Sequence, residues 1–259
     1  MLTKPQLEDL AQLHVIAGEF HADVVIIGAA ALLCFIELGR FTRDVDLVVA
    51  LDLEGFTAFS ARLSTHGWTQ ERLREHRWHG PSGSIIDLIP AGPNLRAKKR
   101  ITWPQSQFEM SLVGFEHAFS RASLLQFGQD MQWRVAPLSV LALLKIISYM
   151  DDPNGRQKDL TDLRVLFRLY EADSERLFGD KVFSADLEDI EYANAFLLGI
   201  DVGGFATQEE REIVNTFLAD HLIPDEELAE LHPDDVQRNG PQFQHQLRAF
   251  QMGLDCDRT

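Results

Sequence analysis

The stretch Gly28–Asp46, GAAALLCFIELGRFTRDVD, decides the fold. It follows the apolar run Val24–Ile27, whose composition predicts a short strand, and Gly28 marks the turn out of that strand. A helix is expected over residues 29–38. The chain then returns as Arg-Asp-Val-Asp into a second apolar strand, Val45–Leu51. This order of elements predicts a mixed α/β unit.

Two carboxylates stand at the start of the second strand. Alternate side chains of a strand face the same way, so Asp44 and Asp46 share one face. Carboxylates held this closely repel each other unless a cation lies between them. A third acid, Asp87, lies in the apolar strand SIIDLI (residues 84–89), where it is costly unless paired or metal-bound. If this strand adjoins the second strand, the three carboxylates provide ligands for two Mg²⁺ ions about 4 Å apart.

These acids predict a site for an NTP and two Mg²⁺ ions. We expect Asp44 and Asp46 to bridge both ions, and Asp87 to bind the ion beside the attacking oxygen and to accept a proton. Backbone N–H groups after Gly28 would offer donors to an anion. The alternative for each acid is an ordinary charged position at a strand start or on a strand edge.

Composition indicates a globular, cytoplasmic protein with no membrane partner. The chain has 259 residues, of which 45% are hydrophobic, enough for one large domain or two smaller ones. Its apolar runs are far shorter than the roughly 20 residues that span a bilayer, and the first ten residues have no apolar signal core. Cys34 and Cys256, the two cysteines, form neither a metal-binding motif nor a disulfide framework.

Negative charge is concentrated in the second half of the chain. Residues 1–150 carry a net charge of −1 and residues 151–259 carry −15, which together make the formal −16. The first half is therefore suited to an anionic substrate, whereas the second would repel nucleic acid at long range. A solvated surface is the simplest interpretation of the acidic half, and a basic partner is the alternative.

Patterning along the chain predicts an α+β class. It consists of a small mixed β-sheet core flanked by helices (residues 1–136), followed by an α-helical C-terminal domain (residues 137–259). Further strands are expected over residues 69–79, Ser84–Ile89 and parts of 108–135. Helices are expected after Thr3-Lys4-Pro5, over 53–64, from Pro137 to Ile147, from Ser184 to near Gly199, after the capping box Thr207/Glu210 and after Pro241.

The motifs resemble the nucleotidyltransferase superfamily whose smallest members resemble the catalytic core of polymerase β. The fit is to the branch with the AbiEii/AbiGii abortive-infection toxins. There an apolar strand meets Gly-Gly or Gly-Ser, and a stretch similar to R-x-T-x-D-h-D follows after a helix. Here residues 26–32, IIGAAAL, resemble the first part, and Arg40-Phe-Thr42-Arg43-Asp44-Val-Asp46 resembles the second. A later helical Lys followed by K-D-x-x-D is matched by Lys145 and by Lys158-Asp159-Leu-Thr-Asp162.

The resemblance implies NTP contacts at several residues. They are Gly28, Ala29, Arg40, Thr42, Arg43, Lys145, Lys158, Asp159 and Asp162. Lys145 would contact the β- or γ-phosphate, with Asp159 orienting it and Asp162 contacting base or ribose. Ala29 departs from the Gly-Gly/Ser pair, because its methyl group offers no hydroxyl and obstructs close approach. A lost hydrogen bond of this kind costs about 1.5–3 kcal/mol.

Other basic and histidine positions give weaker predictions. The cluster Arg96–Arg100 (RAKKR), expected as a loop, is the candidate contact for a nucleic-acid acceptor, and an ordinary solvated loop is the alternative. His76 and His79 have metal-like spacing but no third ligand nearby, and are expected to be structural.

The resulting hypothesis is a Mg²⁺-dependent enzyme that moves an NMP group from an NTP to an RNA (such as a tRNA), a protein or a small molecule. Pyrophosphate is released. The resemblance implies a toxin or phage-defence role and leaves room for a cognate antitoxin as partner. The alternative is a degenerate nucleotide-binding or protein-interaction module of the same fold, because Ala29 stands where Gly or Ser is expected.

Overall fold

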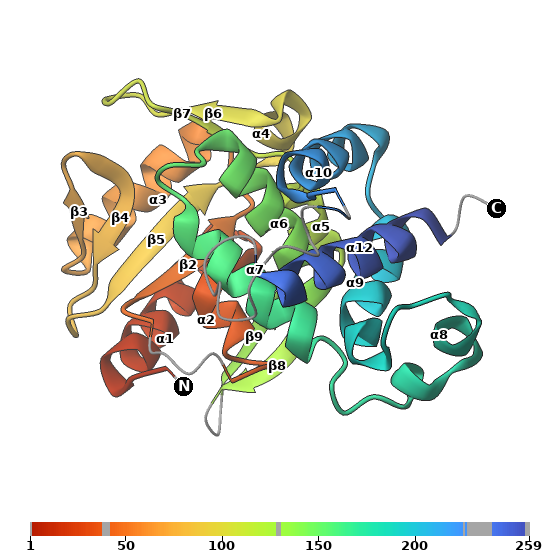
Figure 1. Ribbon diagram of the computed structural model, residues 1–259. Helices are drawn as coiled ribbons and strands as arrows, with labels where there is room; N and C mark the ends of the chain where they lie inside the picture. The colour runs from red at the N-terminus through yellow and green to blue at the C-terminus, as the bar shows by residue number, and fades with distance from the viewer. Residues whose placement is uncertain (1, 38–41, 128–130, 225, 227–239, 257–259) are drawn as a thin grey trace. The chain divides into compact units, whose positions relative to one another are not determined.

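The computed structural model describes residues 2–37, 42–127, 131–224, 226 and 240–256 (Figure 1). The chain divides into two compact units, Met1–Leu141 and Ala142–Thr259. The domain boundary expected near residue 136 stays a prediction. Within the described ranges, every helix is too short or too polar to cross a membrane.

Unit 1 is built on a seven-stranded mixed sheet with the order β3-β4-β5-β2-β1-β9-β8. The bounds are β1 (Val24–Ile27), β2 (Asp44–Val49), β3 (Thr69–Glu71), β4 (Arg74–His79), β5 (Ile85–Pro90), β8 (Ser123–Phe127) and β9 (Met131–Val135). Strand β2 lies between β1, which is antiparallel to it, and β5, which is parallel. A separate hairpin joins β6 (Arg100–Thr102) to β7 (Glu109–Ser111). The expected small mixed sheet is confirmed.

Helices of 5 to 16 residues accompany this sheet. They are α1 (Lys4–Glu19), α2 (Gly28–Leu32), α3 (Leu53–Thr65), α4 (Pro93–Lys98) and α5 (Phe115–Ser120). Helix α1 begins as expected, because Thr3 and Gln6 form a capping box with proline in the first turn. Leu10, Leu13 and Ile16 bury one face of α1, and Phe20 after it packs edge-on against Phe59 of α3. The spacing of apolar residues in α1 therefore determines which face joins the core.

Three local predictions were wrong. Residues 69–79 form a hairpin rather than one strand, because the chain turns at Leu73, which is 84% exposed, and buries Trp78 on the returning strand β4. Residues 96–98 belong to helix α4, which Pro93 opens, so RAKKR is not a loop. The helix expected over 29–38 ends at Leu32, after which the chain forms turns with mixed i→i−3 and i→i−4 hydrogen bonds.

The regular elements described in unit 2 are all helices, as expected. Helix α6 (Leu138–Asp151) begins at the end of unit 1 and continues into unit 2. The other elements are α7 (Gln157–Leu169), η1 (Glu175–Phe178), α8 (Asp180–Ser184), η2 (Ile190–Tyr192), α9 (Ala193–Gly203), α10 (Gln208–His221) and α12 (Pro241–Asp255). The capping box of Thr207 and Glu210 is confirmed at the start of α10, whereas the helix expected right after Ser184 begins only at Ala193.

Glycines hold α9 and α12 together. A Cβ at Gly199 would overlap the carbonyl oxygen of Phe250, and one at Gly253 would overlap the carbonyl oxygen of Phe196. The two helix backbones therefore touch at positions where no side chain fits. This contact explains the glycine within the stretch AFLLGIDVGG, residues 195–204.

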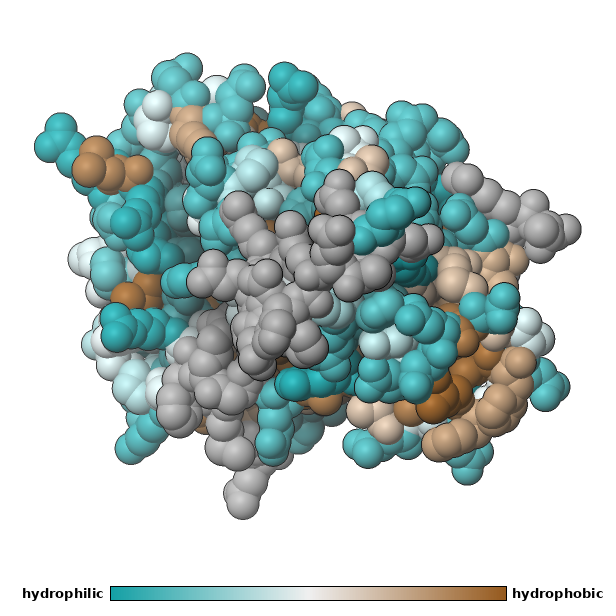
Figure 2. All heavy atoms as spheres, viewed as in Figure 1, coloured by the Kyte–Doolittle hydropathy of each residue, from teal (hydrophilic) through white to brown (hydrophobic). Residues whose placement is uncertain are grey.

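Figure 2 shows apolar side chains gathered over the α8 part of unit 2. Phe178, Phe183 and Ile190, at or near the ends of η1, α8 and η2, are each more than half exposed. Acidic residues, including Asp186 and Glu188, stand among them in the sequence. The acidic half of the chain therefore also presents apolar surface.

We predict that Gly253→Ala lowers the stability of unit 2 by about 1–3 kcal/mol, because the added methyl group forces α9 and α12 apart. Urea unfolding followed by far-UV circular dichroism measures the change. Tryptophan fluorescence should move less, since Trp68, Trp78, Trp103 and Trp133 all lie in unit 1.

The matched control is Gly204→Ala. Gly204 follows the last residue of α9, the partner helix, with a right-handed backbone and only ordinary distances around a new Cβ. A change beyond about 0.5 kcal/mol in the control, or none in Gly253→Ala, would contradict the close-contact interpretation.

Candidate functional site

Strand register brings the predicted acids together in unit 1. In the parallel pair β2–β5, Asp46 lies opposite Asp87. In the antiparallel pair β4–β5, Arg77 lies opposite Asp87. Directly opposed residues face the same side of a sheet, and Asp44 shares the face of Asp46. The expected adjacency of the two acidic strands is therefore confirmed, and a guanidinium joins them on the same face.

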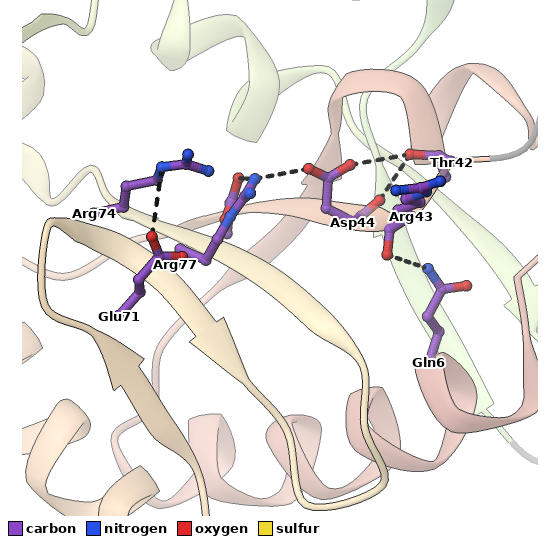
Figure 3. A network of polar contacts seen from close by, with 8 residues as sticks. Gln6, Thr42, Arg43, Asp44, Glu71, Arg74 and Arg77 are labelled. Atoms are coloured by element: carbon purple, nitrogen blue, oxygen red, sulfur yellow. Dashed lines mark hydrogen bonds and ion pairs between the residues drawn. The ribbon is translucent and has the colours of Figure 1, made fainter.

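Arg77 links two of the three carboxylates. Its Nε donates to Oδ1 of Asp87 and its Nη2 to Oδ2 of Asp87, both at 2.8 Å. The same Nη2 donates to Oδ2 of Asp44, also at 2.8 Å. Figure 3 shows Arg77 pointing toward Asp44 from one side, with Thr42 on the other side of that carboxylate. The fork geometry suits arginine, because two parallel N–H groups match the two oxygens of a carboxylate.

The electrostatics of this cluster favour the charged form of Arg77. Its hydrogen bonds to Asp87, and then the negative charges of Asp87 and Asp44, raise the pKa of Arg77 above its ordinary value although partial burial opposes the shift. The Asp87 side chain is 9% exposed, whereas the Asp44 side chain is 35% exposed. The inner end of the cluster is thus shielded from water and its outer end is accessible.

Thr42, which precedes β2, forms hydrogen bonds with Asp44. The hydroxyl of Thr42 donates to the backbone oxygen of Asp44 at 2.9 Å and to its Oδ1 at 3.3 Å. Gln6 of α1 donates to the backbone oxygen of Arg43 at 3.4 Å. Thr42 therefore orients Asp44, and its role as an NTP contact stays a prediction, as does that of Arg43. Arg40 lies outside the described residues.

Gly28 lies directly against Asp46. Its φ of +65° is in the left-handed region that favours glycine, and a Cβ there would overlap the carboxylate of Asp46. Both observations require glycine at this position, so that β1 can turn into α2 beside the acid. Ala29 follows within α2, and its effect on nucleotide binding stays a prediction.

Asp9 was missed by sequence reasoning, although it positions the strands of the site. This α1 residue is 1% exposed and accepts hydrogen bonds from the backbone N–H groups of Ser82 and Ser84 and from the Ser84 hydroxyl. It thereby fixes the turn that joins β4, which carries Arg77, to β5, which carries Asp87. Its place one residue before Leu10, on the buried face of α1, was the available signal.

Unit 2 contains a separate buried ionic cluster. Lys145 of α6 donates to Asp159 Oδ1 at 2.8 Å and to Asp162 Oδ2 at 2.7 Å, both on α7. Burial alone would lower the pKa of Lys145, but the charges of Asp159 and Asp162 and their hydrogen bonds outweigh it, so the pKa is raised. The expected pairing of Lys145 with Asp159 is present, and Asp162 joins it. Contacts of Lys145 and Asp162 with nucleotide stay predictions.

The remaining basic candidates differ in exposure. Lys158 is exposed on the first turn of α7. Arg96 donates to Glu116 at 2.7 Å and lies over the ring of Phe119, so its guanidinium is committed within unit 1. Arg96 therefore fits a structural role better than the acceptor contact expected for the RAKKR cluster.

A divalent cation was expected at the three acids. Among the residues that the structure describes, no group of three or more His, Cys, Asp or Glu side chains is arranged to hold a metal ion. The oxygen donors of Asp44, Asp46 and Asp87 are the kind that Mg²⁺ prefers, and two of these side chains already hold the positive charge of Arg77. The three carboxylates are suitable ligands for Mg²⁺. In this structure Asp44 and Asp87 are positioned to bind the guanidinium of Arg77 instead.

A family model matches residues 13–252 of the chain, with the description "Nucleotidyl transferase AbiEii toxin, Type IV TA system". The match includes both acidic strands, Gly28 and the Lys145 cluster. Comparison with curated proteins returned no match.

Solved structures give weaker similarities. A putative nucleotidyltransferase from H. pylori is 14% identical, covers 98% of this chain and 97% of its own, and has a TM-score of 0.40. An antigenic nucleotidyltransferase-like protein from Paracoccidioides brasiliensis is 18% identical over 60% of this chain and 74% of its own, with a TM-score of 0.38. Neither similarity contributes to the site described above.

We predict that Gly28→Ala destabilises unit 1 by about 2 kcal/mol, because backbone strain and overlap with Asp46 act together. Tryptophan fluorescence in urea measures the change. Gly83→Ala is the control, since Gly83 also has a positive φ (+94°) but no atom within 4 Å of a new Cβ. Equal losses in the two variants would show that the approach to Asp46 adds nothing to the strain.

We also predict that Lys145→Met lowers the free energy of unfolding by about 3–5 kcal/mol, because it leaves two buried carboxylates without their cation. Urea unfolding followed by circular dichroism tests this. Lys158→Met changes an exposed lysine nearby in the sequence and should cost less than about 0.5 kcal/mol. Similar stabilities for the two variants would contradict a structural role for the Lys145 cluster.

Proposed function

The chain belongs to the AbiEii nucleotidyltransferase toxin family, and on that premise we propose that Asp44, Asp46 and Asp87 form its Mg²⁺-dependent transfer site. The observation that carries the proposal is the register of β2 and β5, which sets Asp46 opposite Asp87 with Asp44 on the same face. The reaction proposed is transfer of an NMP group from an NTP to an acceptor hydroxyl, with release of pyrophosphate.

The bond changes define what the residues must do. The acceptor oxygen forms a bond to the α-phosphorus, and the bond from that phosphorus to the pyrophosphate oxygen breaks. The acceptor proton passes to the carboxylate of Asp87. Asp44 and Asp46 would hold the metal ions, with Asp87 as the third ligand. Two bound Mg²⁺ ions would neutralise negative charge on the triphosphate and make the acceptor hydroxyl easier to deprotonate.

Neighbouring residues support these roles by positioning. Thr42 bonds to Asp44 and sets its orientation. Gly28 leaves the space that the Asp46 carboxylate occupies. Arg43, and Arg40 before it, carry positive charge next to the acids in sequence and are proposed to contact phosphate. Catalysis of this kind rests mainly on positioning and charge neutralisation.

The C-terminal residues have proposed roles in nucleotide binding. Lys145, oriented by Asp159, would contact the β- or γ-phosphate, and Asp162 would contact base or ribose; Lys158 would add a further phosphate contact. The pairing of Lys145 with both acids supports the orienting role of Asp159. Lys145, Asp159 and Asp162 are buried and paired with one another. A nucleotide contact would therefore require one of these pairs to separate.

The acceptor is proposed to be an RNA, a protein or a small molecule, and the family description makes a toxin role with a cognate antitoxin the natural biological setting. A degenerate nucleotide-binding module is the second candidate. Ala29 and the Arg77 pairing favour it, because the first removes a phosphate contact and the second occupies the carboxylates.

We predict that wild-type protein transfers label from an α-³²P-NTP, or releases pyrophosphate, in Mg²⁺. Asp44→Asn and Asp87→Asn should each lower the rate by about 100-fold or more, because each removes a charged ligand. Glu54→Gln, which changes an exposed acid of α3, should keep the wild-type rate. NTP binding with no product under any of the four NTPs would support the degenerate module instead.

A further inference from the structure

Arg77 uses the same oxygens that the proposed function assigns to metal ions. It takes both oxygens of Asp87 and one of Asp44. We propose that Arg77 is an internal counter-cation, which a divalent cation must displace from Asp87 and Asp44 before the site is complete. This inference rests on the proposed function, because it takes those carboxylates to be metal ligands.

Electrostatics make the two cations mutually exclusive. A divalent ion binds carboxylate oxygens at about 2.0–2.6 Å, whereas Arg77 lies 2.8 Å from the same atoms. An ion there would meet the guanidinium within a few ångströms, in surroundings that screen charge less than water does. Binding of the ion therefore requires the guanidinium to leave.

Arg77 is placed so that it can leave. Among the described residues its side-chain hydrogen bonds all go to Asp87 and Asp44, so nothing else holds it once these acids are taken. The side chain is 19% exposed and stands on β4, one strand from the edge of the sheet. The charge of Glu71, on the edge strand β3, also acts on Arg77 and offers an acid toward which it can turn.

The exchange has a thermodynamic consequence. With Arg77 docked, its positive charge offsets the repulsion between Asp44 and Asp87, which stabilises the metal-free site. The apparent affinity for metal then equals the intrinsic affinity multiplied by the fraction of molecules in which Arg77 is undocked. Arg77 thus sets the concentration of divalent ion at which the site forms.

Mn²⁺ binding, measured by electron paramagnetic resonance of free Mn²⁺, tests the competition directly. Arg77→Gln should bind Mn²⁺ about tenfold more tightly than wild type, and Arg77→Lys should fall between them, since an ammonium lacks the fork. Arg72→Gln is the matched control. It removes an exposed arginine in the turn between β3 and β4 and should leave Mn²⁺ affinity unchanged. Unchanged or weaker binding by Arg77→Gln would overturn the proposal.

The wild-type chain provides a second test, in which a variant serves only to assign one resonance. The Nε–H resonance of Arg77 in ¹⁵N-labelled protein, assigned by its loss in Arg77→Lys, should exchange slowly with water without metal. Saturating Mg²⁺ should shift it and speed its exchange. A resonance that stays the same throughout the Mg²⁺ titration would overturn the proposal.

Asp87→Asn separates failure of this inference from failure of the proposed function. If adding Asp87→Asn to Arg77→Gln leaves Mn²⁺ binding as it is in Arg77→Gln alone, the ion does not use the Asp87 carboxylate and both proposals fall. If Asp87→Asn loses Mn²⁺ binding while Arg77→Gln binds no more tightly than wild type, the transfer site stands and only the competition is wrong.

Discussion

Three carboxylates on one face of two neighbouring strands impose the main constraint on unit 1. Their mutual repulsion must be balanced by positive charge, and in a partly buried site that charge must be close and well oriented. Arg77 supplies this charge to two of the three acids, with a forked contact to Asp87 and a further bond to Asp44. The turn between β4 and β5, which Asp9 holds, sets Arg77 opposite Asp87.

Unit 2 meets a comparable requirement in a different way. There Lys145 lies between Asp159 and Asp162 with little exposure to water, so the cation and both acids are held as a closed set. The Arg77 cluster is open at its Asp44 end. An open cluster can exchange its cation at lower cost than a closed one, because its outer groups keep part of their hydration. This difference makes the unit 1 acids the better candidate for ion exchange and gives Lys145 a structural task as well.

Glycine serves both units by permitting close approach. Gly28 lets β1 turn against the Asp46 carboxylate, and Gly199 and Gly253 let two helix backbones meet. A Cβ atom would overlap the Asp46 carboxylate at Gly28, and it would overlap a backbone carbonyl oxygen of the other helix at Gly199 and Gly253. The first contact positions an acid of the candidate site, and the second holds the helical core of unit 2. Glycine is required at these positions because of their neighbours, which lie elsewhere in the chain.

Local pattern determined much of this protein. The strand, glycine turn and acidic strand, the caps at Thr3 and Thr207, and the cost of Asp87 in an apolar strand all depend on residues close in sequence, and all could be read without a structure. Only the tertiary structure decided what neutralises the acids. Arg77 lies 10 residues from Asp87 and 33 from Asp44, and its place there depends on a hairpin register that side-chain periodicity leaves open. The sequence indicated that the acids need a cation close to them. Strand pairing determined that Arg77 is the side chain that provides it, because partners across a sheet are set by the packing of the whole unit.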